Sequence, residues 1–370
     1  MDKTRQITMI QIAAILVSTI IGVGVLPLPL FAVNALDSGA PLITLAAVLF
    51  GFISLLLLSL LGMRFPRQTI IQYSEQIIGK WPARAGSLLV IVFFAVLTSL
   101  TAREFGEVVV TSVLKNTPVE VTVIVMLLLA TFSTRNDVTV FAYIHYFYFP
   151  LILFPALFIV ALSLKNADAL NLQPIWGNDP QGVIPGALTI AALFQGSFIL
   201  TSVIPSMRRP QKALLASVVG MVIAGGLYVI IVAATVGVFG AEETKKLLWP
   251  TLELAKATSL PANVLERLDA AFLIVWVTAV FTTLLSSYFL TTQSLGLLFR
   301  LRDHKLFAFF LLPFVFVLAM LPQNIVQMYT IVRMVGRIGL ILTLAYPALL
   351  LLVSILRKKR GEPVGEVAQR

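Results

Sequence analysis

The stretch Ser18–Leu28 has the sequence STIIGVGVLPL and lies near the middle of a charge-free run, residues 6–36. Such a run is long enough to cross a bilayer, for which about 20 apolar residues suffice. Gly22 and Gly24 weaken a helix and allow close approach to its backbone, and Pro27 removes a backbone donor. Broken backbone at membrane depth is tolerated only where protein or a polar cavity satisfies the freed groups. The stretch therefore predicts a discontinuous helix whose unwound turn forms part of a binding site.

The composition places the whole chain in a membrane. Of its 370 residues, 59% are hydrophobic and only 12% are charged, unlike a water-soluble domain. Because helices satisfy their own backbone groups in lipid, we expect a polytopic all-α membrane protein. The formal net charge is +10, but the basic residues lie in short loops between apolar runs, where they set topology. The lipid bilayer is thus an expected partner, and nucleic acid is not.

Apolar segments predict ten transmembrane helices within a single domain, residues 1–370. The segments are 7–35, 40–63, 85–113, 117–134, 138–164, 183–206, 212–239, 268–298, 306–321 and 326–356. The fourth is the weakest because Glu120 falls near its start.

A second interruption lies in the sixth segment, where Phe194–Phe198 (FQGSF) forms a small polar break and Pro205 follows. The second break lies five spans after the first, and because five is odd, the second half of the chain enters the membrane from the opposite side. Matching interruptions in two halves are the sequence sign of an inverted-repeat transporter fold with a site at the bilayer midplane. The alternative is that Gly22 and Gly24 only let two helices pack closely.

The basic residues predict the orientation. With the N-terminus in the cytoplasm, 18 of the 27 Lys and Arg residues fall in inside segments, six in outside segments and three within spans. Cytoplasmic loops carry the excess of Lys and Arg. Both termini are therefore expected in the cytoplasm, with residues 357–370 as a basic tail.

Two connections predict short helices at the membrane surfaces. Residues 67–80 (RQTIIQYSEQIIGK) place isoleucines among polar groups, which indicates an amphipathic helix on the inner side. Residues 240–261 combine mixed charge with a Leu/Trp stripe, which indicates one or two short helices over the outer face. A solvated loop is the alternative for each.

Hydroxyl groups gather in the eighth span. Thr283, Ser286 and Ser287 are spaced i, i+3 and i+4, so they share one helical face. That face is able to complete an oxygen-lined ligand or cation site beside the first break. The alternative is that each hydroxyl bonds back to a carbonyl of its own helix.

Charged residues within spans are costly and by default mark function. Arg103 and Glu107 in the third span are spaced i, i+4, as in a local ion pair, and Glu104 lies beside them. Arg333 and Arg337 in the tenth span are suited either to pairing with Glu104 or Glu107 or to reaching the lipid head groups. The sequence leaves the roles of all five open.

Residue types that carry catalysis are scarce. There is no cysteine, there are two histidines, and no nucleotide-binding loop, Ser/His/Asp set or metal-ligand cluster is present. Tyr143, His145, Tyr146 and Tyr148 at the cytoplasmic end of the fifth span are typical of an aromatic belt, and His145 has no expected catalytic role. Neither an enzyme nor a bound metal or cofactor is expected.

Short motifs over nearly the whole chain resemble one family. They are Ile21–Pro27 (IGVGVLP), Phe65-Pro66, Gln72-Tyr73, Gly79–Trp81 (GKW), Leu247–Thr251 (LLWPT) with Leu254, Glu266-Arg267 and Phe281–Thr283 (FTT). In this order and spacing, the chain resembles the B subunits of bacterial spore germinant receptors, the spore-germination branch of the amino acid–polyamine–organocation (APC) superfamily.

The resemblance implies a LeuT-like 5+5 inverted-repeat fold with discontinuous helices 1 and 6, which here gives repeats 7–164 and 183–356. It implies a multi-pass subunit in the inner membrane of a bacterial spore. The subunit would sense small nutrients such as amino acids beside an A subunit and a lipoprotein C subunit.

The resemblance also implies a ligand pocket at Gly22, near Leu97, at the break near Gly196, and at Thr282 or Thr283. Some relatives have an acidic residue where this chain has Thr101, so a role tied to that acid is not carried over.

The breaks, the hydroxyl face and the resemblance together predict one ligand site near the midplane. Helix ends beside the breaks offer free N–H and carbonyl groups that suit an amino-acid zwitterion without any charged side chain. The predicted site residues are Ile21, Gly22, Val23, Gly24, Leu97, Thr98, Thr101, Phe194, Gln195, Gly196, Ser197, Thr282, Thr283 and Ser286.

The leading hypothesis is a membrane subunit that binds a small-molecule germinant and signals to its partner subunits. One alternative is an amino-acid permease that moves its ligand by alternating access, and another is a scaffold whose pocket binds nothing. The fold permits all three, because fold does not decide function.

Overall fold

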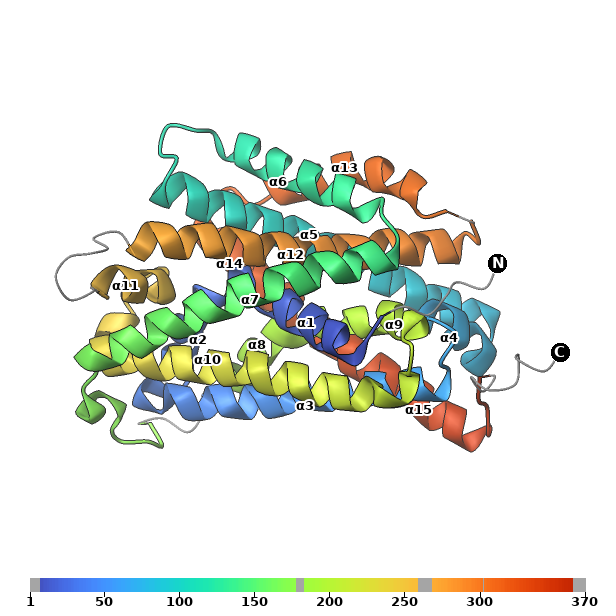
Figure 1. Ribbon diagram of the computed structural model, residues 1–370, viewed down its shortest axis with the longest axis horizontal. Coiled ribbons are helices and arrows are strands. Elements are labelled where there is room, and N and C mark those ends of the chain that lie inside the picture. Colours follow the sequence, from blue (N-terminus) through green and yellow to red (C-terminus); the bar gives the residue numbers. More distant parts are fainter. Residues whose placement is uncertain (1–6, 178–182, 259–267, 302, 362–370) are drawn as a thin grey trace.

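The protein is an all-helical bundle with most helices running along one long axis (Figure 1). The computed structural model describes residues 7–177, 183–258, 268–301 and 303–361. Within these ranges no strand is formed. The α-helices are α1 (Met9–Ile20), α2 (Leu28–Leu36), α3 (Ala40–Arg64), α4 (Ile70–Ile78), α5 (Lys80–Ser112), α6 (Val119–Thr134), α7 (Val138–Ser163), α8 (Val183–Ala191), α9 (Leu200–Val203), α10 (Ala213–Thr244), α11 (Pro250–Ala257), α12 (Leu268–Leu298), α13 (Lys305–Met320), α14 (Ile325–Leu340) and α15 (Tyr346–Leu356).

Seven helical stretches of the described ranges are long and apolar enough to cross a membrane. They are Leu28–Arg64, Lys80–Ser112, Val138–Asn166, Val183–Ser206, Pro210–Thr244, Ala271–Leu298 and Ile325–Leu356. Three shorter apolar helices, α1, α6 and α13, accompany them. The chain is therefore a multi-pass α-helical membrane protein, and each apolar segment marked in the sequence falls on helix.

The stretch Leu28–Arg64 contains a turn at Asp37, which has a φ of 48° between α2 and α3. The two helices pack against each other. Lys245 Nζ lies 2.5 Å from the Asp37 carboxylate and ties this turn to the end of α10. Its ammonium group donates hydrogen bonds to the carboxylates of Asp37 and Glu242, and these bonds raise the pKa of Lys245. α1 and α2 therefore form the two parts of the interrupted first segment.

The amphipathic segment 67–80 forms the short helix α4, as its pattern predicts. Thr69 begins the helix with a capping box, in which its N–H donates to Gln72 Oε1 at 3.0 Å. Gly79 ends it with a φ of 90°, a conformation that favours glycine. Ile70, Ile71, Tyr73 and Ile77 are buried, so α4 lies with one face on the bundle.

The segment 240–261 contains one short helix, α11, after the end of α10. Residues 259–261 of the prediction lie outside the described ranges. Thr251 Oγ1 donates to the carbonyl of Val25 at 2.7 Å, and most side chains of α11 are buried. α11 therefore covers the first helix break rather than lying free in solvent.

α4 and the end of α15 lie at the same end of the bundle, on the right in Figure 1, and basic side chains bind there. Arg84 and Arg300 both pair with Glu75, at 3.3 and 3.0 Å. Arg64 donates to the carbonyl of Lys359 at 2.8 Å. These residues come from three of the segments that the sequence predicts to be cytoplasmic, residues 64–84, 299–305 and 357–370, and the fold brings them to one end of the bundle.

Candidate ligand-binding site

The first break exposes carbonyl groups that neighbouring helices satisfy. α1 ends at Ile20, a single 3-10 turn covers Val23–Val25, and α2 begins at Leu28. The last carbonyls of a helix have no partner within the helix and need one elsewhere. Here hydroxyls of α10 and α12 serve that purpose. Thr282 Oγ1 donates to the carbonyl of Ser18 at 2.8 Å, and Thr283 Oγ1 donates to that of Thr19 at 2.9 Å. Tyr228 OH donates to the carbonyl of Ile20 at 2.6 Å.

Glycines bring the two breaks and α12 into contact. A Cβ atom on Gly22 would overlap the side chain of Thr283. A Cβ on Gly196 would lie 2.9 Å from Cγ2 of Thr19, closer than real Cβ atoms approach. Gly22 is therefore closely packed against α12, and it also lies in the wall of a cavity, which is described below.

The second break is a stretch of 3-10 helix, Ala192–Ile199, between α8 and α9. Gln195 Nε2 donates to the carbonyl of Gly336 on α14 at 2.5 Å. Gln195 Oε1 and Ser197 Oγ are buried, and neither has a hydrogen-bond partner among the described residues. Buried polar atoms usually have a hydrogen-bond partner, so both atoms can accept a further hydrogen bond.

A cavity of about 100 Å³ lies where the two breaks, α5, α12 and α14 meet. Nine predicted site residues line it: Gly22, Val23, Gly24, Leu97, Thr101, Gln195, Gly196, Thr283 and Ser286. Five others do not: Ile21, Thr98, Phe194, Ser197 and Thr282. The cavity thus joins segments that are far apart in the sequence.

The five remaining residues are buried around the cavity instead of facing it. Thr98 Oγ1 donates to Ser287 Oγ on α12 at 2.9 Å, and Ser287 lines the cavity. The ring of Phe194 packs on that of Tyr228, with 5.4 Å between centroids. Thr98 and Phe194 thus contact residues of the cavity lining, and the ligand contacts of these five residues stay predictions.

Charged side chains also line the cavity, which corrects the expectation of a site without them. Glu104 on α5 is only 4% exposed, and Arg333 comes from α14. Glu104 Oε1 accepts a hydrogen bond from Tyr329 OH at 3.2 Å. Glu104 follows the predicted site residue Thr101 by three positions and so lies on the same helical face. This spacing is the feature of the sequence from which its place in the cavity could have been predicted. Arg333 carries no comparable signal.

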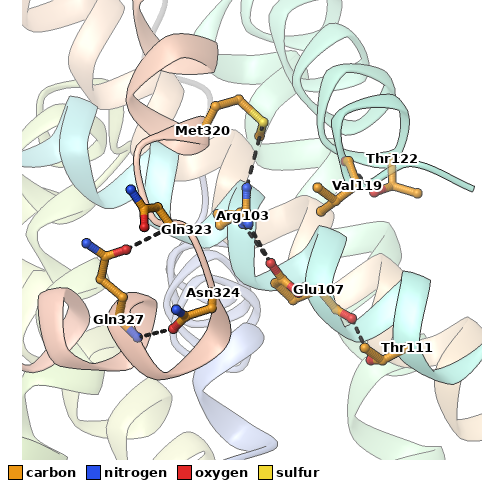
Figure 2. A network of polar contacts seen from close by, with 9 residues as sticks. All are labelled: Arg103, Glu107, Thr111, Val119, Thr122, Met320, Gln323, Asn324 and Gln327. Carbon is orange, nitrogen blue, oxygen red and sulfur yellow. Dashed lines mark hydrogen bonds and ion pairs between the residues drawn. The ribbon is translucent and has the colours of Figure 1, made fainter.

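Arg103 and Glu107 form the predicted i, i+4 ion pair, as Figure 2 shows. The guanidinium lies 2.7 Å from the carboxylate, and Arg103 Nη1 also reaches Met320 Sδ at 3.8 Å. Neither residue lines the cavity. Within the described ranges Arg333 and Arg337 form no ion pair, so their suggested pairing with the acids of α5 is not seen.

His145 does not belong to an aromatic belt. It is completely buried, whereas Tyr143 and Tyr146 are exposed as a belt requires. His145 Nε2 lies 3.2 Å from Ser286 Oγ, which in turn lies 2.6 Å from Thr19 Oγ1. The imidazole is therefore part of a polar cluster that reaches the cavity wall.

Some hydroxyls of α12 bond back to carbonyls of their own helix, and others reach the first break, so both predicted uses occur. Thr291 Oγ1 bonds back to the carbonyl of Ser287 at 2.7 Å, and Ser287 Oγ to that of Leu284 at 3.1 Å. Thr283 and Ser286 instead reach α1 and line the cavity. The hydroxyl face therefore joins α12 to the first break.

Comparison with known proteins matches residues 6–328 to the family described as "Spore germination protein". The chain is similar to the spore germination proteins YndE and B2 of Bacillus subtilis (strain 168). YndE is 27% identical over 363 residues, which cover 98% of this chain and 99% of YndE. B2 is 26% identical over 364 residues, 96% of this chain and 97% of B2. Spore germination protein GerLB of Bacillus cereus is 22% identical over 347 residues, 93% of each chain. The family match includes both helix breaks.

Proposed function

Because the chain belongs to the family of spore germination proteins, we propose that it is the membrane subunit of a germinant receptor. A small nutrient, most simply an amino acid, binds in the cavity between the two breaks, and binding signals germination to partner subunits of the A and C types. The observation that carries this proposal is the cavity of about 100 Å³ at the junction of two interrupted helices. The proposal assigns no catalytic step to the protein.

The proposal includes an architecture. Ten spans form a LeuT-like 5+5 inverted repeat, 7–164 and 183–356, with helices 1 and 6 discontinuous. The interruptions at matching positions and the turn at Asp37 support this arrangement. Both termini lie in the cytoplasm and the protein resides in the inner membrane of the spore; the basic residues gathered at one end of the bundle support the orientation.

Signalling requires that the ligand prefer one arrangement of the broken helices. A ligand shifts an equilibrium only by its differential affinity for the two states. Lining residues come from the 3-10 turn after α1, from the second break and from α12, so a bound ligand contacts parts that the breaks allow to move separately. Moving the population from 1:99 to 99:1 requires a preference of about 10⁴-fold.

A permease is the alternative function. It is favoured by the same unwound backbone at two matching breaks, the feature on which alternating access depends in transporters of this architecture. A receptor binds its ligand and transmits the change, whereas a permease releases the ligand on the other side. Both functions therefore include ligand binding, but only a permease causes the ligand to accumulate on the other side of the membrane.

The first test is a thermal-shift screen of the purified protein in detergent. The probes are neutral amino acids, sugars and nucleosides, each with and without sodium, because ligands that bind the folded state raise its stability by mass action. Stabilisation that is lost in Gly196→Leu and kept in Gly226→Leu supports the cavity; a Cβ on Gly226 meets no atom within 4 Å. No stabilisation by any probe contradicts the proposed function.

The second test uses proteoliposomes that contain this chain alone. We expect the stabilising probe, radiolabelled, to bind without accumulating inside the vesicles. Sustained accumulation that Gly196→Leu abolishes would instead establish the permease.

A further inference from the structure

Glu104 is a carboxylate in the interior of a membrane protein, and it lines the cavity without an ion pair to any described residue. The residue is 4% exposed and lines the cavity from α5. A buried charge is costly unless it is paired and hydrogen-bonded. Intramembrane acids accordingly mark sites where a charged species is handled.

The described residues supply this carboxylate with a hydrogen bond but with no ion pair. Trp249 Nε1 donates to Tyr329 OH at 3.0 Å, and Tyr329 OH donates to Glu104 Oε1 at 3.2 Å. Because Trp249 donates to Tyr329, the Tyr329 hydroxyl directs its own proton to the Glu104 carboxylate, which acts as the acceptor. Arg103, the adjacent residue, pairs with Glu107 instead. Among the described residues, no ion pair is formed by Glu104.

A second acceptor in the same cavity lacks a donor. Gln195 is 3% exposed, its Nε2 is bonded to Gly336, and its Oε1 is without a partner in the described part of the chain. A carboxylate and an amide oxygen without a donor are both acceptors, and together they suit a ligand group that has several N–H donors and a positive charge. Arg333 lines the same cavity without an ion pair to a described residue, which suits a ligand that also carries a carboxylate.

We propose that Glu104 binds the ammonium group of an amino-acid ligand, with Gln195 Oε1 as a second acceptor. This inference rests on the proposed function and narrows it to ligands that carry a protonated amine. Neutral sugars and nucleosides do not meet the requirement. Glu104 is thus the residue that distinguishes an amino acid from a hydroxy acid of the same shape.

The test measures dissociation constants by calorimetry in detergent. The probes are small neutral L-amino acids and, for each one that binds, its 2-hydroxy acid, for example L-alanine and L-lactate. We expect the hydroxy acid to bind the wild type at least ~30-fold more weakly, because it leaves a buried charge unpaired. This comparison needs no variant. Equal affinities for the two probes overturn the inference.

Glu104→Gln supplies the second arm, since it keeps an acceptor for Tyr329 and removes the charge. We expect its affinity for the amino acid to fall at least ~30-fold. Glu107→Gln is the matched control, an acid of the same helix outside the cavity, and its affinity should stay within about twofold of wild type. Undiminished binding by Glu104→Gln overturns the inference.

The outcomes separate this inference from the proposed function. Binding of a sugar or nucleoside that Gly196→Leu abolishes, with no amino acid bound, leaves the proposed function intact and overturns the role of Glu104. Absence of binding by every probe overturns both.

Discussion

The Oγ of Ser18 lies 2.6 Å from Nδ1 of His145, and this contact joins the last turn of α1 to α7. The Ser18 hydroxyl donates to the carbonyl of Ala14 at 2.7 Å, so its oxygen is free to accept from Nδ1–H. Nε2 is then the acceptor for Ser286 of α12. One buried imidazole thus holds the first broken helix between two others.

Replacing His145 by leucine should destabilise the protein. The change leaves Ser18 and Ser286 without their partner in an apolar interior, which costs about 1–3 kcal/mol. Thermal unfolding in detergent measures the loss. Tyr146→Leu is the matched control, because Tyr146 is the next residue and is 47% exposed; a surface change of this kind stays within about 0.5 kcal/mol. Equal melting temperatures for the two variants would contradict the proposed role of His145.

The helices and the breaks were predictable because their signals are local. Long apolar runs specify helices in lipid, and glycine and proline within them specify interruptions. The capping residues of α4, Thr69 and Gly79, are equally local. These features need no knowledge of what packs against them.

The place of Arg333 in the cavity wall and the burial of His145 could not be predicted from the sequence in the same way. α7 is apolar on every side, so its sequence does not tell which face turns inward. Arg333 lines the cavity only because α14 packs against α5 and the second break. Such contacts between distant segments depend on the tertiary arrangement, which local patterns do not encode.

Gly22→Ala should separate α12 from the first break. Even one methyl group at this position overlaps Thr283, so the hydroxyl that caps α1 must move. We expect a stability loss of about 1–3 kcal/mol together with loss of ligand-induced stabilisation, both measured by thermal shift. Gly226→Ala is the control, since its Cβ meets open space. A Gly22→Ala protein that melts and responds to ligand like wild type would place the site elsewhere.

Thr251→Val should loosen the cover that α11 places over the first break. The substitution preserves shape but removes the 2.7 Å hydrogen bond to the carbonyl of Val25, which costs about 1 kcal/mol. Hydrogen exchange of a peptide spanning Ser18–Leu28 should become faster. The comparison is Thr330→Val, an exposed threonine that bonds to its own helix. If exchange in the two variants is identical, α11 does not restrain the break.

Glu75→Gln should remove an acid-dependent part of the stability. Burial alone raises the pKa of Glu75, but hydrogen bonds from Arg300 and Arg84 outweigh it and hold the pKa below the usual 4.5. A lowered pKa contributes stability that is present above the unfolded-state value and is lost as pH falls through the folded-state value. Wild type should therefore melt above Glu75→Gln at pH 7, and the gap should close below about pH 4.5.

Salt provides the control for this last prediction. The pairs that Glu75 forms are partly exposed, and at 1 M salt the screening length falls to about 3 Å. The difference in melting temperature at pH 7 should then shrink without any change in pH. A gap that persists unchanged from pH 7 to pH 3 would mean that Glu75 acts through packing of α4 on the bundle, and the ion pairs would have no part in docking this helix.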